Sequence, residues 1–412
     1  MEKTISYWLI IETYVHISLS PRGVLFYNTL DSKILESDNN NVLLIADKLL
    51  TNENRYCTLI KEKDLKNKEI SDFINDLKMN FMGDVIPIDY SKSAPIQLSP
   101  LLDIQNEISS KSLMSDPAVG KNVLNYLYEL NIYLNGTCQN TCEACLDTYK
   151  QITCCRKTSI KKEFELDELK RLVHETKNSN LSKINILGGN ILNYSHFDEL
   201  IEIIADTRFS IVLNLHICNF EKRITTLHQS NITLNLIIDF NSKWDELKSR
   251  ISETLNLKLK TTYTFILSSI KEVERAESII KEYKIQNFDF KPFYNGQNTE
   301  FFQNEVFLSK DDILEKPISM KGIFRNSIIN TNYFGVLSIA NDGKVYADLN
   351  KDVIGNIYED SIKDCIFREI TKGKSWFRVR NIGKCKDCLY RELCPPISNY
   401  ETALNKENLC HI

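Results

Sequence analysis

The feature that most constrains the fold of this chain is a regular alternation of strand-like and helix-like segments in its middle. Six apolar runs predict strands, and the segments between them carry apolar residues at helical spacing. Because parallel strands need a long crossover connection, the alternation favours a parallel α/β sheet with right-handed helical crossovers, which could curl into a partial barrel. The expected strands are Leu130–Leu134, Lys183–Leu187, Phe209–His216, Ile232–Phe240, Lys260–Leu267 and Phe288–Phe293, and the expected helices are Leu166–Lys177, Ser195–Asp206, Glu221–Gln229, Trp244–Leu255 and Ile270–Tyr283.

Three cysteines follow the first of these strands, in the string Cys138-Gln-Asn-Thr-Cys142-Glu-Ala-Cys145. Three thiolates on one short loop can hold three corners of a [4Fe–4S] cluster and leave the fourth iron free to bind a small molecule. The loop falls at the carboxyl edge of the expected sheet, where such folds place their chemistry. The alternative is a zinc knuckle, but zinc needs four ligands, and His174 and His196 lie in expected helices without matching spacing.

This motif in this place resembles the radical S-adenosylmethionine (SAM) superfamily. The resemblance implies a [4Fe–4S] cluster on Cys138, Cys142 and Cys145, whose open iron binds the amino and carboxylate groups of SAM. One-electron cleavage of SAM would then release a 5′-deoxyadenosyl radical that abstracts hydrogen from a substrate.

A glycine pair ends the second expected strand, in Ile186-Leu-Gly188-Gly189-Asn190. It resembles the Gly-Gly-Glu-Pro motif of the superfamily, which implies that Gly188, Gly189 and Asn190 contact SAM. Asn190 and the isoleucine after it depart from that motif, and Ala144 stands where the superfamily usually has a larger residue near the adenine.

A second cysteine cluster lies near the C-terminus. Its spacing resembles the SPASM extension of peptide-modifying radical SAM enzymes, which typically carries two auxiliary clusters. Ser398 and Asp348 occupy places where cysteines of the inner cluster are expected, so the resemblance implies one auxiliary [4Fe–4S] cluster. A zinc site with four cysteine ligands is the alternative. The implied ligands are Cys385, Cys388, Cys394 and Cys410.

The chain has 12 cysteines and begins without an export signal, so we expect metal or redox use in the cytoplasm rather than a disulfide framework. Cys57 and Cys218 are expected to be buried apolar residues. Cys154 and Cys155 lie near the first cluster and could act as loop thiols or redox partners. Cys365 lies too far along the chain to replace a lost inner ligand without rearrangement.

We expect four regions: an α+β domain over residues 1–92, a connector over 93–126, the partial barrel over 127–316 and a SPASM-like domain over 317–412. In the first region, strand-like runs flank the turn signal Pro21-Arg-Gly and predict a hairpin. The other expected elements there are strands Tyr7–Glu12 and Asp84–Asp89 and helices Val42–Leu50 and Ile70–Phe81.

The N-terminal region resembles the winged-helix-like leader-recognition element of maturases that act on ribosomally made peptides. This resemblance implies that a leader peptide adds as a strand to an edge of the sheet, supplied by the hairpin that ends in Val24–Leu30. A dimerisation or capping domain is the alternative. Strings such as Tyr7-Trp-Leu-Ile-Ile-Glu and Leu187-Gly-Gly-Asn also resemble a maturase family of Bacteroidales-type peptide clusters, which includes degenerate relatives.

The expected function is therefore a radical SAM maturase that modifies a ribosomal precursor peptide and draws on an electron donor. The alternative is a degenerate protein that binds the precursor and delivers it to a partner maturase. The net charge is −4 and the sequence has no basic patch, so we expect no binding to nucleic acid. The apolar runs are too short to span a bilayer, so we expect no association with a membrane. The peptide, the bond formed and the oligomeric state are open.

Overall fold

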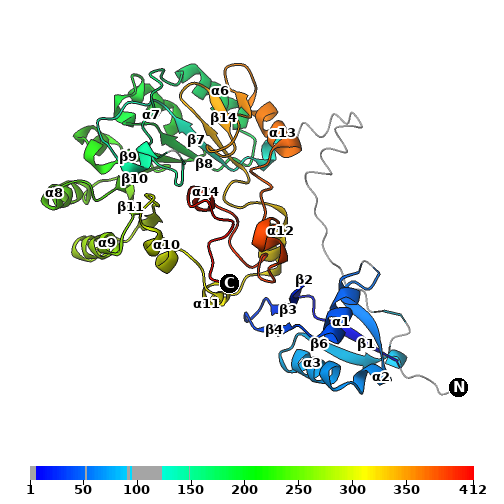
Figure 1. Cartoon of the computed structure of the whole chain (residues 1–412). Coiled ribbons are helices and arrows are strands. Elements are labelled where there is room, and N and C mark those ends of the chain that lie inside the picture. The colour runs from blue at the N-terminus through cyan, green and yellow to red at the C-terminus, as the bar shows by residue number, and fades with distance from the viewer. Residues whose placement is uncertain (1–5, 52, 91–92, 95–122, 148) are drawn as a thin grey trace.

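The computed structural model describes residues 6–51, 53–90, 93–94, 123–147 and 149–412, and the account below concerns these residues. Most of the expected connector, residues 93–126, lies outside them. The described part consists of an N-terminal unit and a larger body built on one long sheet (Figure 1).

The N-terminal unit contains two three-stranded antiparallel sheets. In one, β1 (Ser6–Ile11) lies between β5 (Cys57–Lys61) and β6 (Gly83–Pro87). In the other, β3 (Gly23–Asn28) lies between β2 (Val15–Ser20) and β4 (Ile34–Ser37), which confirms the expected β2–β3 hairpin. The short strand β4 pairs with β3, so the edge that the hairpin itself offers in this sheet is β2.

Helices α1 (Asn40–Leu50), α2 (Glu62–Leu65) and α3 (Lys68–Met79) accompany these sheets. Asn39 and Asn67 cap α1 and α3 by accepting hydrogen bonds from backbone N–H groups of the first turn. The helical spacing of Ile70, Phe73 and Leu77 buries one face of α3, so this unit has a core of its own.

The body is built on a nine-stranded sheet in the order β12-β11-β10-β9-β8-β7-β13-β14-β15. Neighbouring strands from β7 to β12 are parallel, as the alternation predicted. These strands are β7 (Glu129–Tyr133), β8 (Lys183–Leu187), β9 (Ser210–His216), β10 (Ile232–Ile238), β11 (Lys260–Leu267) and β12 (Phe288–Pro292).

Four of the five predicted crossover helices are present: α6 (Leu166–Thr176), α7 (Phe197–Ala205), α8 (Trp244–Thr254) and α9 (Ile270–Tyr283). The predicted helix Glu221–Gln229 is wrong, because only a 3₁₀ segment, Lys222–Thr226, forms there. The hydroxyl groups of Thr225 and Thr226 donate to backbone carbonyls three residues earlier. Such local bonds compete with the α-helical pattern.

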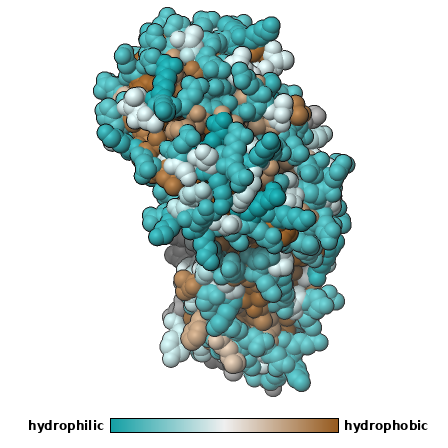
Figure 2. All heavy atoms as spheres, turned by 90° about the vertical axis from the view of Figure 1, so that its left-hand side faces the viewer, coloured by the Kyte–Doolittle hydropathy of each residue, from teal (hydrophilic) through white to brown (hydrophobic). Residues whose placement is uncertain are grey.

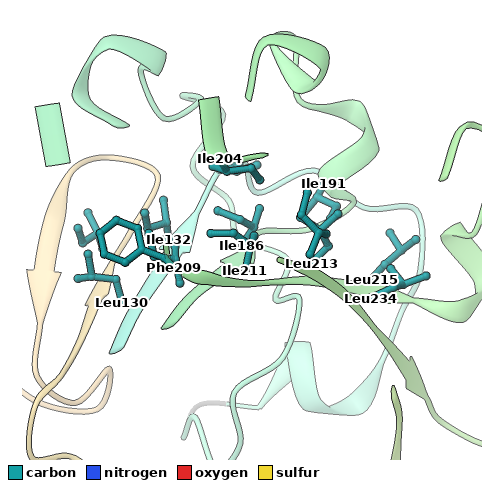
Figure 3. Close-up of a cluster of buried hydrophobic side chains, with 14 of the residues drawn as sticks. Leu130, Ile132, Ile186, Ile191, Ile204, Phe209, Ile211, Leu213, Leu215 and Leu234 are labelled. Carbon is teal, nitrogen blue, oxygen red and sulfur yellow. The ribbon is translucent and has the colours of Figure 1, made fainter. Parts of the chain in front are cut away.

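The helix-covered face of the sheet forms the main core. Leu130 and Ile132 of β7, Ile186 of β8 and Leu213 of β9 point to this face together with Ile204 of α7 (Figure 3). Because side chains alternate along a strand, the residues between them face the other side of the sheet. Those residues are largely asparagine and threonine.

The C-terminal part extends the same sheet. β13 (Val336–Ile339) pairs in parallel with β7 and antiparallel with β14 (Lys344–Tyr346), which pairs with β15 (Gly355–Asn356). The indole N–H of the buried Trp376 donates to the carbonyl of Val336 at 3.1 Å and anchors the following segment to β13. The helices of this part are α10 (Thr299–Glu305), α11 (Lys310–Leu314), α12 (Met320–Ile328), α13 (Ile362–Lys372) and α14 (Asn399–Ala403).

The β2–β3–β4 sheet of the N-terminal unit contacts the C-terminal part of the body (Figure 1). Nε2 of His16 lies 2.9 Å from a carboxylate oxygen of Glu392, and Glu36 accepts hydrogen bonds from Lys310 at 2.8 Å and from Tyr390. Polar contacts therefore join segments more than 270 residues apart in the sequence.

The surface shown in Figure 2 is mostly hydrophilic, with hydrophobic side chains in separate small patches. In the part of the chain that the structure describes, no helix combines the length and the apolar character needed to cross a membrane.

Candidate metal centre at the carboxyl edge of the sheet

The cysteine loop leaves the carboxyl end of β7, as the sequence predicted. A short helix, α5 (Glu143–Leu146), begins directly after Cys142 and carries Cys145. Cys142 is buried, and Cys138 and Cys145 are partly exposed. The three thiols are thus presented on one tight loop at the sheet edge.

The sulfur of Cys145 is the meeting point of several groups. The neighbouring thiols of Cys142 and Cys154 stabilise its thiolate form and hold the pKa of Cys145 well below its ordinary value. The backbone N–H of Lys157 donates to the Cys145 sulfur at 3.3 Å. The amide of Asn219 donates to the Cys138 sulfur at 3.4 Å. Donors aimed at sulfur stabilise the thiolate, which is the form that binds metal.

His216 and Asp239, at the ends of β9 and β10, face Cys142. The ligand atoms of these three residues lie within 4.8 Å of one another. The backbone N–H of Cys218 donates to Nδ1 of His216 at 3.2 Å, so we assign the ring proton to Nε2, which lies 3.4 Å from Oδ1 of Asp239. Nε2 makes no hydrogen bond within the described part of the chain, so its contact with the Asp239 carboxylate is electrostatic.

The glycine pair allows the carboxyl end of β8 to lie close to the cysteine loop. Gly188 and Gly189 have φ of +113° and +48°, and a Cβ at Gly189 would lie 2.1 Å from the carbonyl oxygen of Thr137. The N–H groups of the pair donate to the carbonyls of Cys155 at 2.9 Å and Arg156 at 2.8 Å. These two donors are therefore used within the protein.

Asn190 is turned toward its own loop. Its side-chain oxygen accepts a hydrogen bond from the Leu192 N–H at 3.1 Å, and its N–H donates to the Thr137 carbonyl at 2.7 Å. The asparagine that replaces the expected glutamate thus caps a short turn, and its carbonyl accepts from the Asn135 side chain at 3.1 Å.

The donor set suits an iron–sulfur cluster. Thiols of Cys138, Cys142 and Cys145 come from one loop, and N–H groups point at two of their sulfurs. The ligands of an iron–sulfur cluster lie farther apart than those of a single metal ion, and here all three would be thiolates. Three cysteines of one loop, with N–H groups donating to their sulfurs, match this requirement.

A polar cavity of about 570 Å³ lies on the face of the sheet opposite the helices. Side-chain amides form a hydrogen-bonded row across its floor, from Asn185 to Asn131 at 2.7 Å and from Asn235 to Asn214 at 2.8 Å. Thr264 extends the row by donating to Asn235 at 2.8 Å. The residues Lys150–Thr153, which follow the cysteine loop along the chain, also line this cavity.

The four C-terminal cysteines are also brought near one another, since each of Cys385, Cys388 and Cys394 lies within electrostatic range of the Cys410 sulfur. The guanidinium of Arg380 reaches the Cys385 sulfur at 3.9 Å. The amide of Asn408 donates to Cys410 at 3.0 Å. The structure thus brings the four predicted ligands into the same part of the fold, with Cys385 and Cys394 buried and Cys388 and Cys410 partly exposed.

Hydrogen bonds occupy the place of the expected inner cluster. Asp348 accepts from the amide of Asn399 at 3.1 Å and from the N–H of Asn350 at 2.9 Å. Ser398 caps α14 by accepting from the Tyr400 N–H at 3.2 Å. The two positions that lack cysteine are therefore part of a polar network.

The remaining cysteines differ in their surroundings. Cys57 and Cys365 are buried in the apolar cores, as expected for Cys57. Cys218 is only partly buried and its sulfur lies 3.2 Å from the Ser242 hydroxyl. The sequence left the role of Cys154 open, and nothing in the pattern indicated that it lies against Cys145. Its only signal was proximity along the chain.

Crystal structures of SuiB from Streptococcus suis resemble this chain. One SuiB structure superposes with a TM-score of 0.51 at 14% identity and covers 98% of this chain and 100% of that chain. Structures of SuiB bound to S-adenosylmethionine and of SuiB bound to the precursor peptide SuiA each give a TM-score of 0.49 at 13% identity, over 98% of this chain and 99% of that chain. No protein-family model and no curated protein matches. The likeness at this identity shows a shared fold.

Proposed function

We propose that this protein is a radical SAM maturase that modifies a ribosomally made precursor peptide. The single observation that carries the proposal is the three-cysteine loop at the carboxyl end of β7 in a parallel sheet, followed along the chain by a segment that lines a polar cavity. SuiB, which shares the fold, has been crystallised with SAM and with a precursor peptide.

In this proposal Cys138, Cys142 and Cys145 hold a [4Fe–4S] cluster. When bound, that group supplies the electron, received from an external donor, for reductive cleavage of SAM to a 5′-deoxyadenosyl radical. The N–H groups of Lys157 and Asn219 would stabilise the thiolates of Cys145 and Cys138, and Asp239 and His216 lie beside Cys142.

The amide-lined cavity is suited to a peptide substrate. Asparagine side chains offer both donors and acceptors to a peptide backbone. A volume of about 570 Å³ accommodates a few residues and not a folded domain. Cys385, Cys388, Cys394 and Cys410 would hold one auxiliary [4Fe–4S] cluster beside this region.

The N-terminal unit offers a place for the leader. A groove between the end of β2 and α1 is lined by Leu19, Pro21, Leu43, Leu44 and Asp47. Leu44 is 62% exposed, which is unusual for a large apolar side chain on a helix that faces a groove. Apolar leader side chains would pack there, with a basic residue near Asp47.

The catalytic test is 5′-deoxyadenosine formation. Anaerobically reconstituted protein, given dithionite, SAM and the candidate precursor peptide encoded beside its gene, should release 5′-deoxyadenosine, detected by mass spectrometry. A C142A variant should release none. Reconstituted protein with a full complement of iron that yields none with its peptide would contradict the proposal.

The leader site is tested by binding. L44D should weaken precursor binding at least tenfold, because it places a charge in the groove. L30D is the matched control, since Leu30 is 66% exposed at the opposite end of the β2–β3 hairpin. Equal affinities of the two variants would exclude this groove as the leader site.

A second candidate function, delivery of the precursor to a partner maturase, is favoured by one observation. The N–H groups of Gly188 and Gly189 are engaged by the segment after the cysteine loop, and the cavity beside Ala144 measures only about 20 Å³, enough for about one water. A delivery protein should bind the precursor and show no measurable SAM binding.

A further inference from the structure

Strand β3 of the N-terminal unit is buried on both of its faces. Val24 and Phe26 pack into the unit's own core, whereas Leu25 and Tyr27 belong to a second apolar cluster, which includes residues of the body. Because side chains alternate along a strand, one face of the β2–β3–β4 sheet stabilises the unit and the body covers the opposite face. Leu25 is fully buried, so water is excluded from this contact.

Residues 388–394 of the body, here called the auxiliary loop, meet this face of the sheet. Cys388 and Cys394, at the two ends of the loop, pack with the same apolar cluster and are two of the four predicted auxiliary ligands. A Cβ at Gly23, where β3 begins, would lie 3.7 Å from the side chain of Leu389. The loop between the two ligands therefore lies against the N-terminal unit.

Polar side chains of the sheet fix the same loop. Glu36 of β4 accepts hydrogen bonds from the Tyr390 hydroxyl and, at 2.8 Å, from the Lys310 ammonium. That ammonium also lies 5.3 Å from the centre of the Tyr390 ring. On β2, Nε2 of His16 lies 2.9 Å from a carboxylate oxygen of Glu392. Hydrogen bonds to a charged group are stronger than those between neutral groups, so Glu36 is the main polar contact of the loop.

The segment that carries the fourth ligand is connected to the same cluster. The Leu308 N–H donates to the carbonyl of Leu409 at 3.0 Å, and the N–H of His411 donates to the Leu308 carbonyl at 3.0 Å. These two bonds hold Cys410 beside Leu308, which packs against the apolar cluster. Three of the four predicted auxiliary ligands therefore depend on the contact between the N-terminal unit and the body.

We propose that the N-terminal unit is a structural part of the auxiliary metal site and that its β2–β3–β4 sheet holds the auxiliary loop in the conformation that retains the metal. The inference rests on the proposed function for the presence of that metal. Without the sheet, the auxiliary loop would gain conformational freedom that metal binding must then remove, so the metal would be held less tightly.

The same contact lies next to the groove that the proposed function assigns to the leader. Pro21 lines that groove, and Gly23, at the end of the same turn, faces Leu389 of the auxiliary loop. The unit that binds the leader would thereby also determine whether the auxiliary metal is retained.

The test measures how fast metal leaves the full-length, anaerobically reconstituted protein for an excess of chelator, with iron and zinc counted separately. E36R should release the auxiliary metal at least about tenfold faster than the wild type, because it removes hydrogen bonds to a charged group and places a cation beside Lys310. L25D, which buries an unpaired charge in the contact, should do the same. E62R is the matched control, since Glu62 pairs with Lys66 inside the N-terminal unit at 3.2 Å.

Charge exchange gives the second readout. The double variant E36R/K310E restores a pair of opposite charges across the contact and should return the release rate toward that of the wild type. A role of Glu36 in folding of the N-terminal unit alone would give no such rescue. Release from E36R and L25D as slow as from E62R, or from the double variant as fast as from E36R, would overturn the inference.

C394A, which lacks one ligand, defines the metal content without the auxiliary site. A wild type that holds no more metal than C394A would contradict the auxiliary cluster of the proposed function, and with it this inference. A wild type that holds more metal than C394A, but releases it at the same rate as E36R and L25D, would refute only the role of the N-terminal unit.

Discussion

Replacing Gly189 by alanine should loosen the cysteine loop by a calculable amount. The left-handed backbone of this residue costs an alanine about 1–2 kcal/mol. The new Cβ would lie 2.1 Å from the Thr137 carbonyl oxygen, so that carbonyl must move and the 2.7 Å hydrogen bond from the Asn190 N–H is lost, for about 1 kcal/mol more. The local cost is about 2–3 kcal/mol.

Gly296 provides the matched control. It also has a positive φ, +85°, but a Cβ there would meet nothing within 4 Å. G296A should therefore show the backbone cost alone, about 1–2 kcal/mol. The difference between the two variants isolates the close approach of the glycine pair to the cysteine loop.

The assay is hydrogen–deuterium exchange of the segment 134–146, read by mass spectrometry, together with iron per chain. Exchange reports local opening, so it does not require the whole chain to unfold in one step. G189A should raise exchange in this segment and lower bound iron at the loop, and G296A should change neither. Equal exchange and equal iron in both variants would refute the reasoning.

Three further outcomes are expected. C394A should lose about four irons per chain relative to wild type, whereas C365A should lose none, as measured by iron analysis. Burial raises the pKa of Glu392, but His16 lowers it further, to below its ordinary value of 4.5, so its stabilising contribution is present above that pH and lost below it. The melting temperature of E392Q should accordingly fall less than that of wild type as the pH is lowered from about 5 to about 3. I186A, in the fully buried core of β8, should destabilise the body by about 3 kcal/mol in chemical denaturation.

The spacing of apolar residues along the sequence predicted most strands and helices of the central parallel sheet. Strands β8 and β11 begin and end where the sequence predicts, because apolar residues that face the core recur at every second position along them. Helix α9 follows its amphipathic stripe in the same way. The segment Glu221–Gln229 failed because hydroxyl groups satisfy its backbone locally.

The sequence also predicted the position of the cysteine loop, because a motif that directly follows a strand must lie at the carboxyl end of that strand. The position of Cys154 depends on hydrogen bonds to the glycine pair, which lies more than 30 residues away. The second edge of β3 likewise pairs with β4, and this strand is too short for an alternating apolar pattern to predict it.

Sequence alone thus determined which residues form strands and helices, and where sulfur ligands can collect, because these properties depend on spacing within a short stretch of chain. Tertiary structure alone decided which thiol approaches Cys145, which strand edge is covered and which hydrogen bonds occupy the site around Asp348. Those contacts join residues distant in sequence, and no local pattern records them.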